Sequence, residues 1–197
     1  MAHTDLTEMA EVCGPAVKKK AVLPPDERLY AAVDLGTNSC RMLIARPEGI
    51  NFQIVDAFSK PVYLGKGLVD NGNLSRDAMG RTMAALNICK QKLCHNHVNH
   101  VRLVATEACR QAKNGRTFLR RVREQTGLRF EVIPPKEEAR LAVVGAAPHV
   151  CETSEQILVV DIGGGSTEMV WIDLRTVAPE HRKAAVLNLP IGSKRKK

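Results

Sequence analysis

Two short segments of this sequence carry an aspartate, glycines and hydroxyl side chains in the same order. They span residues 31–45 and 158–172 and align without a gap, 127 residues apart. Matching positions hold the same residue type at Asp34 and Asp161, Gly36 and Gly163, Ser39 and Ser166, and Met42 and Met169. Each copy reads as a hairpin: an apolar strand ends in aspartate, a turn of small residues follows, and a second apolar strand leaves. One such turn usually only reverses the chain, so the duplication is the informative feature.

The residue types in these turns suit phosphate. Glycine accepts backbone angles that let successive N–H groups point into one concavity, and nearby hydroxyl groups add donors. We therefore predict two phosphate-binding turns, formed by Gly36, Thr37, Asn38 and Ser39 and by Gly163, Gly164, Gly165, Ser166 and Thr167. Two lobes could present these turns from opposite sides of one cleft.

Charged residues near the turns suit a metal ion and its phosphate ligand. Mg²⁺ prefers oxygen ligands and offsets phosphate charge, so we predict Asp34, Asp161 and Glu168 as ligands, directly or through water. Arg110 follows a predicted strand, and a guanidinium can pair bidentately with phosphate oxygens. The alternatives are an ordinary surface ion pair for Arg110 and simple turn capping for the aspartates.

The elements that position these residues can be outlined from hydrophobic spacing. The predicted helices run from Ser75 to about His95 and over residues 115–126 and 136–147, with Asn114 as a second cap and Gly127 as a stop. Beyond the first hairpin, the predicted strands cover residues 52–58, 61–64, 101–105, 130–133, 157–161, 168–174 and 184–188. Strands come first and then alternate with helices, which predicts α/β lobes with a mixed sheet.

This outline divides the chain into three parts. Residues 1–28 are predicted to be a flexible N-terminal extension, residues 29–150 a first lobe that carries a phosphate turn, and residues 151–197 the start of a second, incomplete lobe. If the second lobe repeats the first, less than half of it is present. We therefore expect the N-terminal part of a longer protein, with the sheet face around Val159 uncovered.

Composition narrows the class of protein. With 44% apolar and 25% charged residues in 197, the chain can bury a core. No apolar run approaches the roughly 18 residues of a membrane span, and no secretory signal is evident, so a cytoplasmic protein with no membrane partner is expected. Four charges of the net +8 lie in residues 194–197. A mildly basic body suits polyanions, and seven scattered aromatic residues argue against a nucleic-acid partner.

Four ordered motifs resemble the exopolyphosphatase and guanosine pentaphosphate phosphohydrolase (Ppx/GppA) family. They read Val-Asp-Leu-Gly-Thr-Asn-Ser, Val-Ala-Thr-Glu-Ala-Cys-Arg, Phe-Glu-Val-Ile-Pro-Pro-Lys-Glu-Glu-Ala-Arg-Leu and Val-Asp-Ile-Gly-Gly-Gly-Ser-Thr-Glu. The resemblance runs from about Tyr30 to Gly192. It implies lobes of the actin-like, sugar-kinase-like ATPase fold, which is ribonuclease H-like, with the first lobe complete and the second partial. It also implies hydrolysis of terminal phosphates from inorganic polyphosphate or guanosine pentaphosphate.

The resemblance also points to a catalytic base. In the family a glutamate of the Glu-Glu-Ala-Arg stretch has this role, which carries over to Glu138 here. The family often has Ser-Gly before that pair, whereas Pro134, Pro135 and Lys136 stand in this sequence. Without catalysis, Glu137 and Glu138 would still suit the dipole of a helix that begins there.

Other functions and one metal site remain open. The same scaffold could serve a kinase or ATPase, or the chain could be a non-catalytic remnant, and a homodimer of the full-length form is a further option. A dense cluster contains Cys89, Cys94, His95, His97 and His100. Its spacing fits none of the usual zinc patterns, and the two cysteines are off-register on a helix, so we favour a solvated helix end.

Overall fold

The computed structural model describes residues 24, 27–49, 51–151, 153–175 and 184–193. The predicted N-terminal extension lies almost wholly outside these ranges, as does the basic end at residues 194–197. Contacts divide the chain into two compact units, Met1–Val132 and Ile133–Lys197. Within the described ranges, no helix combines the length and hydrophobicity that crossing a membrane requires.

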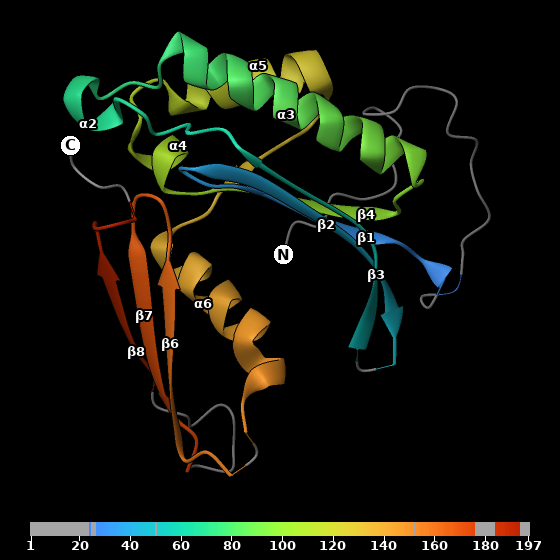
Figure 1. The fold of residues 1–197 in the computed structure, drawn as a ribbon, viewed down its shortest axis with the longest axis vertical. Coiled ribbons are helices and arrows are strands. Elements are labelled where there is room, and N and C mark those ends of the chain that lie inside the picture. The colour runs from blue at the N-terminus through green and yellow to red at the C-terminus, as the bar shows by residue number, and fades with distance from the viewer. Residues whose placement is uncertain (1–23, 25–26, 50, 152, 176–183, 194–197) are drawn as a thin grey trace. The chain divides into compact units, whose positions relative to one another are not determined.

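The first unit is built on a five-stranded mixed sheet with the order β3-β2-β1-β4-β5 (Figure 1). Its strands are β1 (Tyr30–Leu35), β2 (Ser39–Glu48), β3 (Asn51–Pro61), β4 (His100–Ala105) and β5 (Glu131–Val132). β2 pairs antiparallel with β1 and β3, whereas β4 runs parallel to β1 and β5. β1 is therefore central, and the first glycine turn leaves from its carboxyl end.

The described part of this unit contains the helices α2 (Leu68–Asn71), α3 (Arg76–His95), α4 (Glu107–Gln111) and α5 (Gly115–Thr126). α3 and α5 lie side by side over one face of the sheet (Figure 1). The predicted cap of α3 is confirmed, since Ser75 Oγ accepts a hydrogen bond from Ala78 N at 3.2 Å. α5 ends as predicted at Gly127, whose φ of 80° is left-handed.

Asn114 occupies the predicted cap position before α5, but its side chain makes no capping hydrogen bond to that helix. Its side chain instead exchanges two hydrogen bonds with the backbone of Leu74, with Leu74 N donating at 2.8 Å and Asn114 Nδ2 donating to Leu74 O at 3.0 Å. This asparagine therefore joins the segment before α3 to the start of α5.

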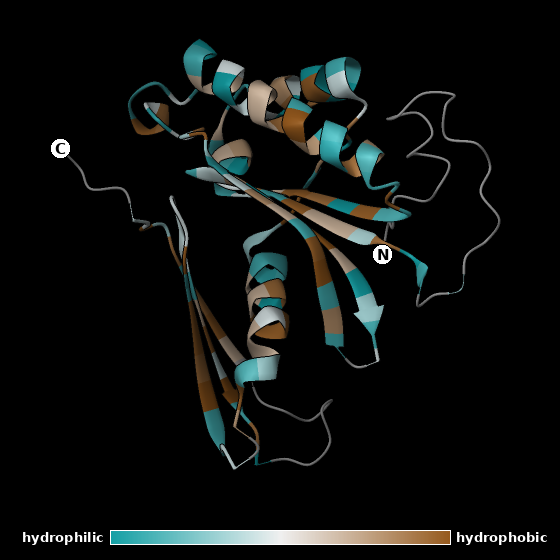
Figure 2. Ribbon diagram, turned by 45° about the vertical axis from the view of Figure 1, so that its right-hand side comes forward, coloured by the Kyte–Doolittle hydropathy of each residue, from teal (hydrophilic) through white to brown (hydrophobic). Residues whose placement is uncertain are grey.

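Buried and exposed residues alternate along β1, and this alternation shows which face of the sheet packs into the core. Ala31, Val33 and Leu35 are buried, whereas Tyr30 and Ala32 are exposed, as expected for a strand covered on one side. Leu86, Leu93 and Val122 are fully buried members of the same core cluster and come from α3 and α5. Those two helices accordingly mix hydrophobic and hydrophilic residues along their length (Figure 2).

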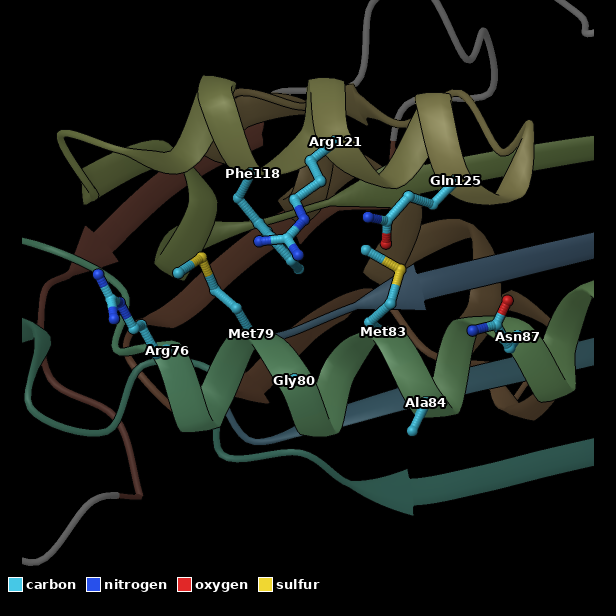
Figure 3. Close-up of a pocket in the computed structure, with 9 residues that line it drawn as sticks. All are labelled: Arg76, Met79, Gly80, Met83, Ala84, Asn87, Phe118, Arg121 and Gln125. Carbon is cyan, nitrogen blue, oxygen red and sulfur yellow. The ribbon is translucent and has the colours of Figure 1, made fainter.

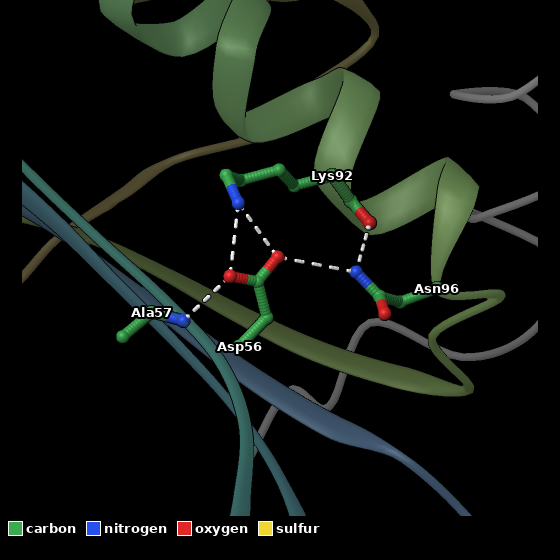
Figure 4. A network of polar contacts seen from close by, with 4 residues as sticks. All are labelled: Asp56, Ala57, Lys92 and Asn96. Carbon is green, nitrogen blue, oxygen red and sulfur yellow. Dashed lines mark hydrogen bonds and ion pairs between the residues drawn. The ribbon is translucent and has the colours of Figure 1, made fainter.

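A polar network fastens the end of α3 to β3 (Figure 4). Lys92 Nζ donates to both carboxylate oxygens of Asp56, at 2.9 and 2.7 Å, and Asn96 Nδ2 donates to Asp56 Oδ2 at 3.3 Å. Ala57 N donates to Asp56 Oδ1 at 2.8 Å. The Lys92 ammonium holds the pKa of Asp56 below its ordinary value.

The second unit is a smaller α/β assembly. A helix, α6 (Pro135–Ala146), and a short 3₁₀ turn, η2 (Ala147–His149), precede an antiparallel sheet of β6 (Gln156–Ile162), β7 (Thr167–Asp173) and β8 (Ala184–Leu189). β7 is central. α6 packs against all three strands. The predicted division between residues 150 and 151 differs from the observed one because α6 belongs with this second sheet.

One face of the second sheet is covered and the other is bare. Glu168 and Val170 are buried, at 1% and 4% exposure, and Val159 is the cross-strand partner of Val170 on that same face. Leu158 and Ile162 point to the opposite side and are 57% and 65% exposed. The face around Val159, predicted to be uncovered, is therefore the one against which α6 packs, and the exposed apolar face is its opposite.

Candidate phosphate-binding site

The first glycine turn links β1 to β2. Gly36 N donates to Ser39 O at 3.0 Å, which closes the turn. The segment after β3 then secures it, because Val62 N donates to Asn38 O at 2.8 Å and Gly65 N donates to Thr37 O at 3.0 Å. The turn is therefore fixed from both sides by backbone hydrogen bonds.

The second glycine turn links β6 to β7 and repeats this arrangement. Gly163 N donates to Ser166 O at 2.9 Å, the same pair of turn positions as Gly36 and Ser39. The segment after β8 secures it, since Ser193 N donates to Gly163 O at 2.9 Å and Thr167 Oγ1 donates to Ile191 O at 2.5 Å. The internal repeat read from the sequence thus extends to the hydrogen bond that closes each turn.

Two glycines behind the turns were not predicted as site residues. Gly65 and Gly192 stand at the same spacing of 127 residues as the turns themselves. A Cβ on Gly192 would lie 2.5 Å from Gly164 C, closer than real Cβ atoms approach, and would also strike Gly165 N. Extending the repeat beyond the hairpins to Leu-Gly-Lys and Ile-Gly-Ser would have revealed this pair.

The predicted metal ligands fall into both units. Asp161 and Glu168 are cross-strand partners at the end of the second hairpin, so their carboxylates belong to one sheet face. Asp161 is exposed and Glu168 is buried. In the first unit the equivalent partner of Asp34 is Arg41. The second hairpin is therefore the one in which two carboxylates, the kind of group that Mg²⁺ prefers, are cross-strand partners.

Arg110 lies on α4, a short helix that the sequence interpretation missed. Its Nε donates to Glu107 Oε2 at 2.8 Å, its Nη2 also contacts that oxygen, and Gln111 Nε2 contacts Glu107 Oε1. Thr106, which precedes α4, donates from its N to Leu35 O at 3.2 Å. α4 is thereby tied to the end of β1, next to the first turn. Glu107, only 9% exposed, is the neighbouring residue that sequence reasoning did not single out.

Glu138 lies in the first turn of α6, in the second unit. The helix begins cleanly at the two prolines: Pro135 takes the first position, and Pro134 O accepts from Glu137 N and Glu138 N at 3.0 and 3.1 Å. The unusual Pro-Pro-Lys entry is therefore compatible with a helix. Glu137 pairs with Arg140 at 2.7 and 2.9 Å, which raises the pKa of Arg140. Glu138 is half-buried.

The cysteine and histidine cluster separates in space. Cys89 is buried, with its Sγ 4.0 Å from Cys40 Sγ, and this contact together with burial raises the pKa of the Cys40 thiol. The His100 ring stacks on Tyr30 with centroids 5.0 Å apart. Across the described ranges, no three histidine, cysteine or acidic residues come together as a possible metal site.

Known proteins resemble this chain over most of its length. The model of the Ppx/GppA phosphatase family matches residues 43–195. A guanosine-5′-triphosphate,3′-diphosphate pyrophosphatase of Photobacterium profundum is 38% identical over 146 residues, which cover 74% of this chain and 29% of that protein.

Solved structures give the same result. The Aquifex aeolicus member of the Ppx/GppA family is 34% identical with a TM-score of 0.69, covering 84% of this chain and 52% of that one. An exopolyphosphatase from Cytophaga hutchinsonii is 26% identical with a TM-score of 0.75, covering 84% and 51%. The chain thus spans about half the length of these solved relatives. Its fold is the mixed α/β, actin-like ATPase fold, and it belongs to the Ppx/GppA phosphatase family.

Proposed function

We propose that this chain contributes to a hydrolase that removes terminal phosphates from inorganic polyphosphate or guanosine pentaphosphate with the help of Mg²⁺. The observation that supports this most is the pair of glycine turns, closed by the same hydrogen bond at Gly36 and at Gly163. Turns of this kind bind phosphate oxygens through backbone N–H groups. Two of them suit a substrate with more than one phosphate.

The roles of the charged residues follow from what phosphoryl transfer to water requires, which is charge neutralisation and an oriented nucleophile. In the second unit, Asp161 and Glu168 would hold Mg²⁺, and Asp34 is the matching candidate ligand of the first unit; the metal would supply part of the neutralisation. Arg110, oriented by Glu107, supplies a guanidinium for the phosphate oxygens.

Glu138 takes the proton of the attacking water in this proposal. The neighbouring Glu137 pairs with Arg140. A positioned general base contributes roughly 10²- to 10⁴-fold to the rate. The attacking water forms the new P–O bond while the bond to the next phosphate breaks, and the proton passes to the Glu138 carboxylate.

The substrate class rests on the relatives. The Photobacterium protein carries a guanosine-5′-triphosphate,3′-diphosphate pyrophosphatase name, and the Cytophaga protein is described as an exopolyphosphatase. Both descriptions concern cleavage of phosphoanhydride bonds. We therefore extend that bond type to this chain.

The test measures phosphate release from long-chain polyphosphate, guanosine pentaphosphate and ATP in the presence of Mg²⁺. Glu138→Gln should lower turnover about 100-fold or more while substrate binding persists. Glu137→Gln is the matched control, because it removes the same charge one position earlier on α6, and it should retain activity. Unchanged turnover in Glu138→Gln would remove the assigned base.

A non-catalytic phosphate-binding module is the second candidate, because the match covers about half the length of the solved relatives. It predicts that polyphosphate binds without any release of phosphate. Release from ATP alone would instead support a kinase or ATPase on the same scaffold.

A further inference from the structure

A groove of about 580 Å³ opens between α3 and α5 in the first unit (Figure 3). None of its lining residues belongs to a glycine turn. Phe118, 2% exposed, lies at its base, and Met79 and Met83 point from α3 toward α5. Its volume falls in the range of roughly 300–1,000 Å³ typical of small-molecule sites, and its mix of apolar and polar lining is also typical of them.

The guanidinium and carboxamide side chains that line this groove occupy different parts of its length. Arg76 and Asn87 mark its two ends on α3, eleven residues apart, which is roughly 16 Å at the helical rise. From α5, Arg121 reaches into the middle of the groove, and Gln125 lies on the Asn87 side of it (Figure 3). The groove therefore has amides at one end, thioethers in the middle, and guanidinium groups in the middle and at the other end.

These polar groups have no protein partners within the part of the chain that the structure describes. The side chains of Arg76, Asn87, Arg121 and Gln125 form no hydrogen bond or ion pair there. Arginines elsewhere do, as Arg140 does with Glu137. No aspartate or glutamate lines the groove. Its charge therefore favours an anionic ligand.

We propose that this groove binds an adenine nucleotide, with the base at the amide end and the phosphate between Arg121 and Arg76. The edge of adenine offers one donor, N6–H, beside one acceptor, N7, and a carboxamide such as Asn87 or Gln125 offers the complementary pair. Guanine presents two acceptors along the same edge and leaves the amide oxygen without a donor.

The middle of the groove suits the rest of the nucleotide. The purine face is apolar and polarisable, and thioethers such as Met79 and Met83 pack well against such rings. Guanidinium groups form charge-assisted, often bidentate hydrogen bonds with phosphate oxygens. AMP contains no phosphoanhydride bond, so its binding here does not depend on the hydrolase proposal.

The experiment titrates AMP into the 197-residue chain by isothermal calorimetry. Arg121→Gln should weaken AMP binding about tenfold, the size expected for loss of a hydrogen bond to a charged group. Arg123→Gln is the matched control, since Arg123 is exposed on the same helix but does not line the groove, and it should bind AMP as the parent chain does. Asn87→Asp removes the amide donor and should abolish the preference for AMP over GMP.

Several results would overturn the proposal. Absence of AMP binding at millimolar concentration would do so, as would equal losses in Arg121→Gln and Arg123→Gln, which indicate unspecific attraction. Inorganic triphosphate that binds as tightly as AMP and competes with it would reduce the groove to an anion site. Displacement of AMP by decanoate at lower concentration would make the groove a site for amphiphiles. Binding that is lost in Glu138→Gln would place AMP elsewhere, because Glu138 belongs to the second unit.

Discussion

The two turns show how closely single residues can determine a site. Gly36 and Gly163 form the same hydrogen bond in sheets that share no strand. The turn is therefore a property of the local sequence, in which glycine permits a close approach to the carbonyl at the end of the turn. A Cβ would lie 3.3 Å from Ser39 O at Gly36 and 3.1 Å from Ser166 O at Gly163.

Gly192→Ala tests whether the segment behind the second turn holds it in place. The new Cβ would lie 2.5 Å from Gly164 C and 2.7 Å from Gly164 O. Relief of that overlap must move the backbone, because no flexible side chain is involved, and overpacking of this kind costs about 1–3 kcal/mol. Urea denaturation monitored by the fluorescence of Trp171, the only tryptophan in the sequence, should report the loss of stability in the second unit.

Gly145→Ala provides the matched control for this change. Gly145 lies near the end of α6, and a Cβ there meets nothing within 4 Å. Alanine is the better helix former, so stability should stay the same or rise slightly. If both substitutions shift the unfolding midpoint equally, the close approach at Gly192 has no energetic role.

At the scale of elements, the sequence predicted those whose ends carry local signals. Ser75, Gly127 and the two prolines at the start of α6 mark helix ends through side-chain or backbone chemistry that needs no distant partner. α4 was missed because five residues give too little periodicity to read. The position of Asn114 before α5 was predicted, but the contact of its side chain was not, because the partner, Leu74, lies 40 residues away. Which sheet α6 joins likewise depends on tertiary contacts.

Asp56→Asn tests the attachment of α3 to β3. Because the ion pair lowers the pKa of Asp56, its contribution to stability is present above the ordinary carboxyl pKa of about 3.9 and is lost as pH falls through the lower folded value. The side chains of Lys92 and Asp56 are 33% and 25% exposed, so the loss at pH 7 should be about 0.5–1 kcal/mol. Below about pH 4 the difference between the variant and the parent chain should shrink, and it should vanish once the pH is below the lowered pKa of folded Asp56.

Glu131→Gln is the control for that measurement. It removes a carboxylate from the Arg102–Glu131 pair, in which Glu131 is 43% exposed, so a smaller and more salt-sensitive change is expected. Denaturation curves of both variants at several pH values supply the comparison. A stability difference for Asp56→Asn that stays constant between pH 7 and pH 3 would contradict the role of the ionised carboxylate.

At the scale of the whole molecule, the two units differ in how many apolar side chains they bury. Every member of the main hydrophobic core cluster lies in the first unit. In the second, the buried apolar residues among those described are Ile133, Ala139 and Val170. Full burial of a large apolar side chain is worth roughly 1.5–3 kcal/mol. Apolar burial therefore stabilises the first unit much more than the second. The exposed face of the second sheet, which includes Leu158 and Ile162, adds no buried apolar surface to the second unit.

Hydrogen exchange should therefore protect β1 more than β7. The two strands are a matched pair, since each is hydrogen-bonded to a neighbour on both sides, and the number of hydrogen bonds cannot explain a difference. Local opening follows the buried apolar surface of each unit, so backbone amides such as that of Val170 should exchange at least about tenfold faster than that of Val33. Native-state exchange read by NMR resolves both residues. Equal protection would mean that the two units open together, in which case the core of the first unit also stabilises the second turn.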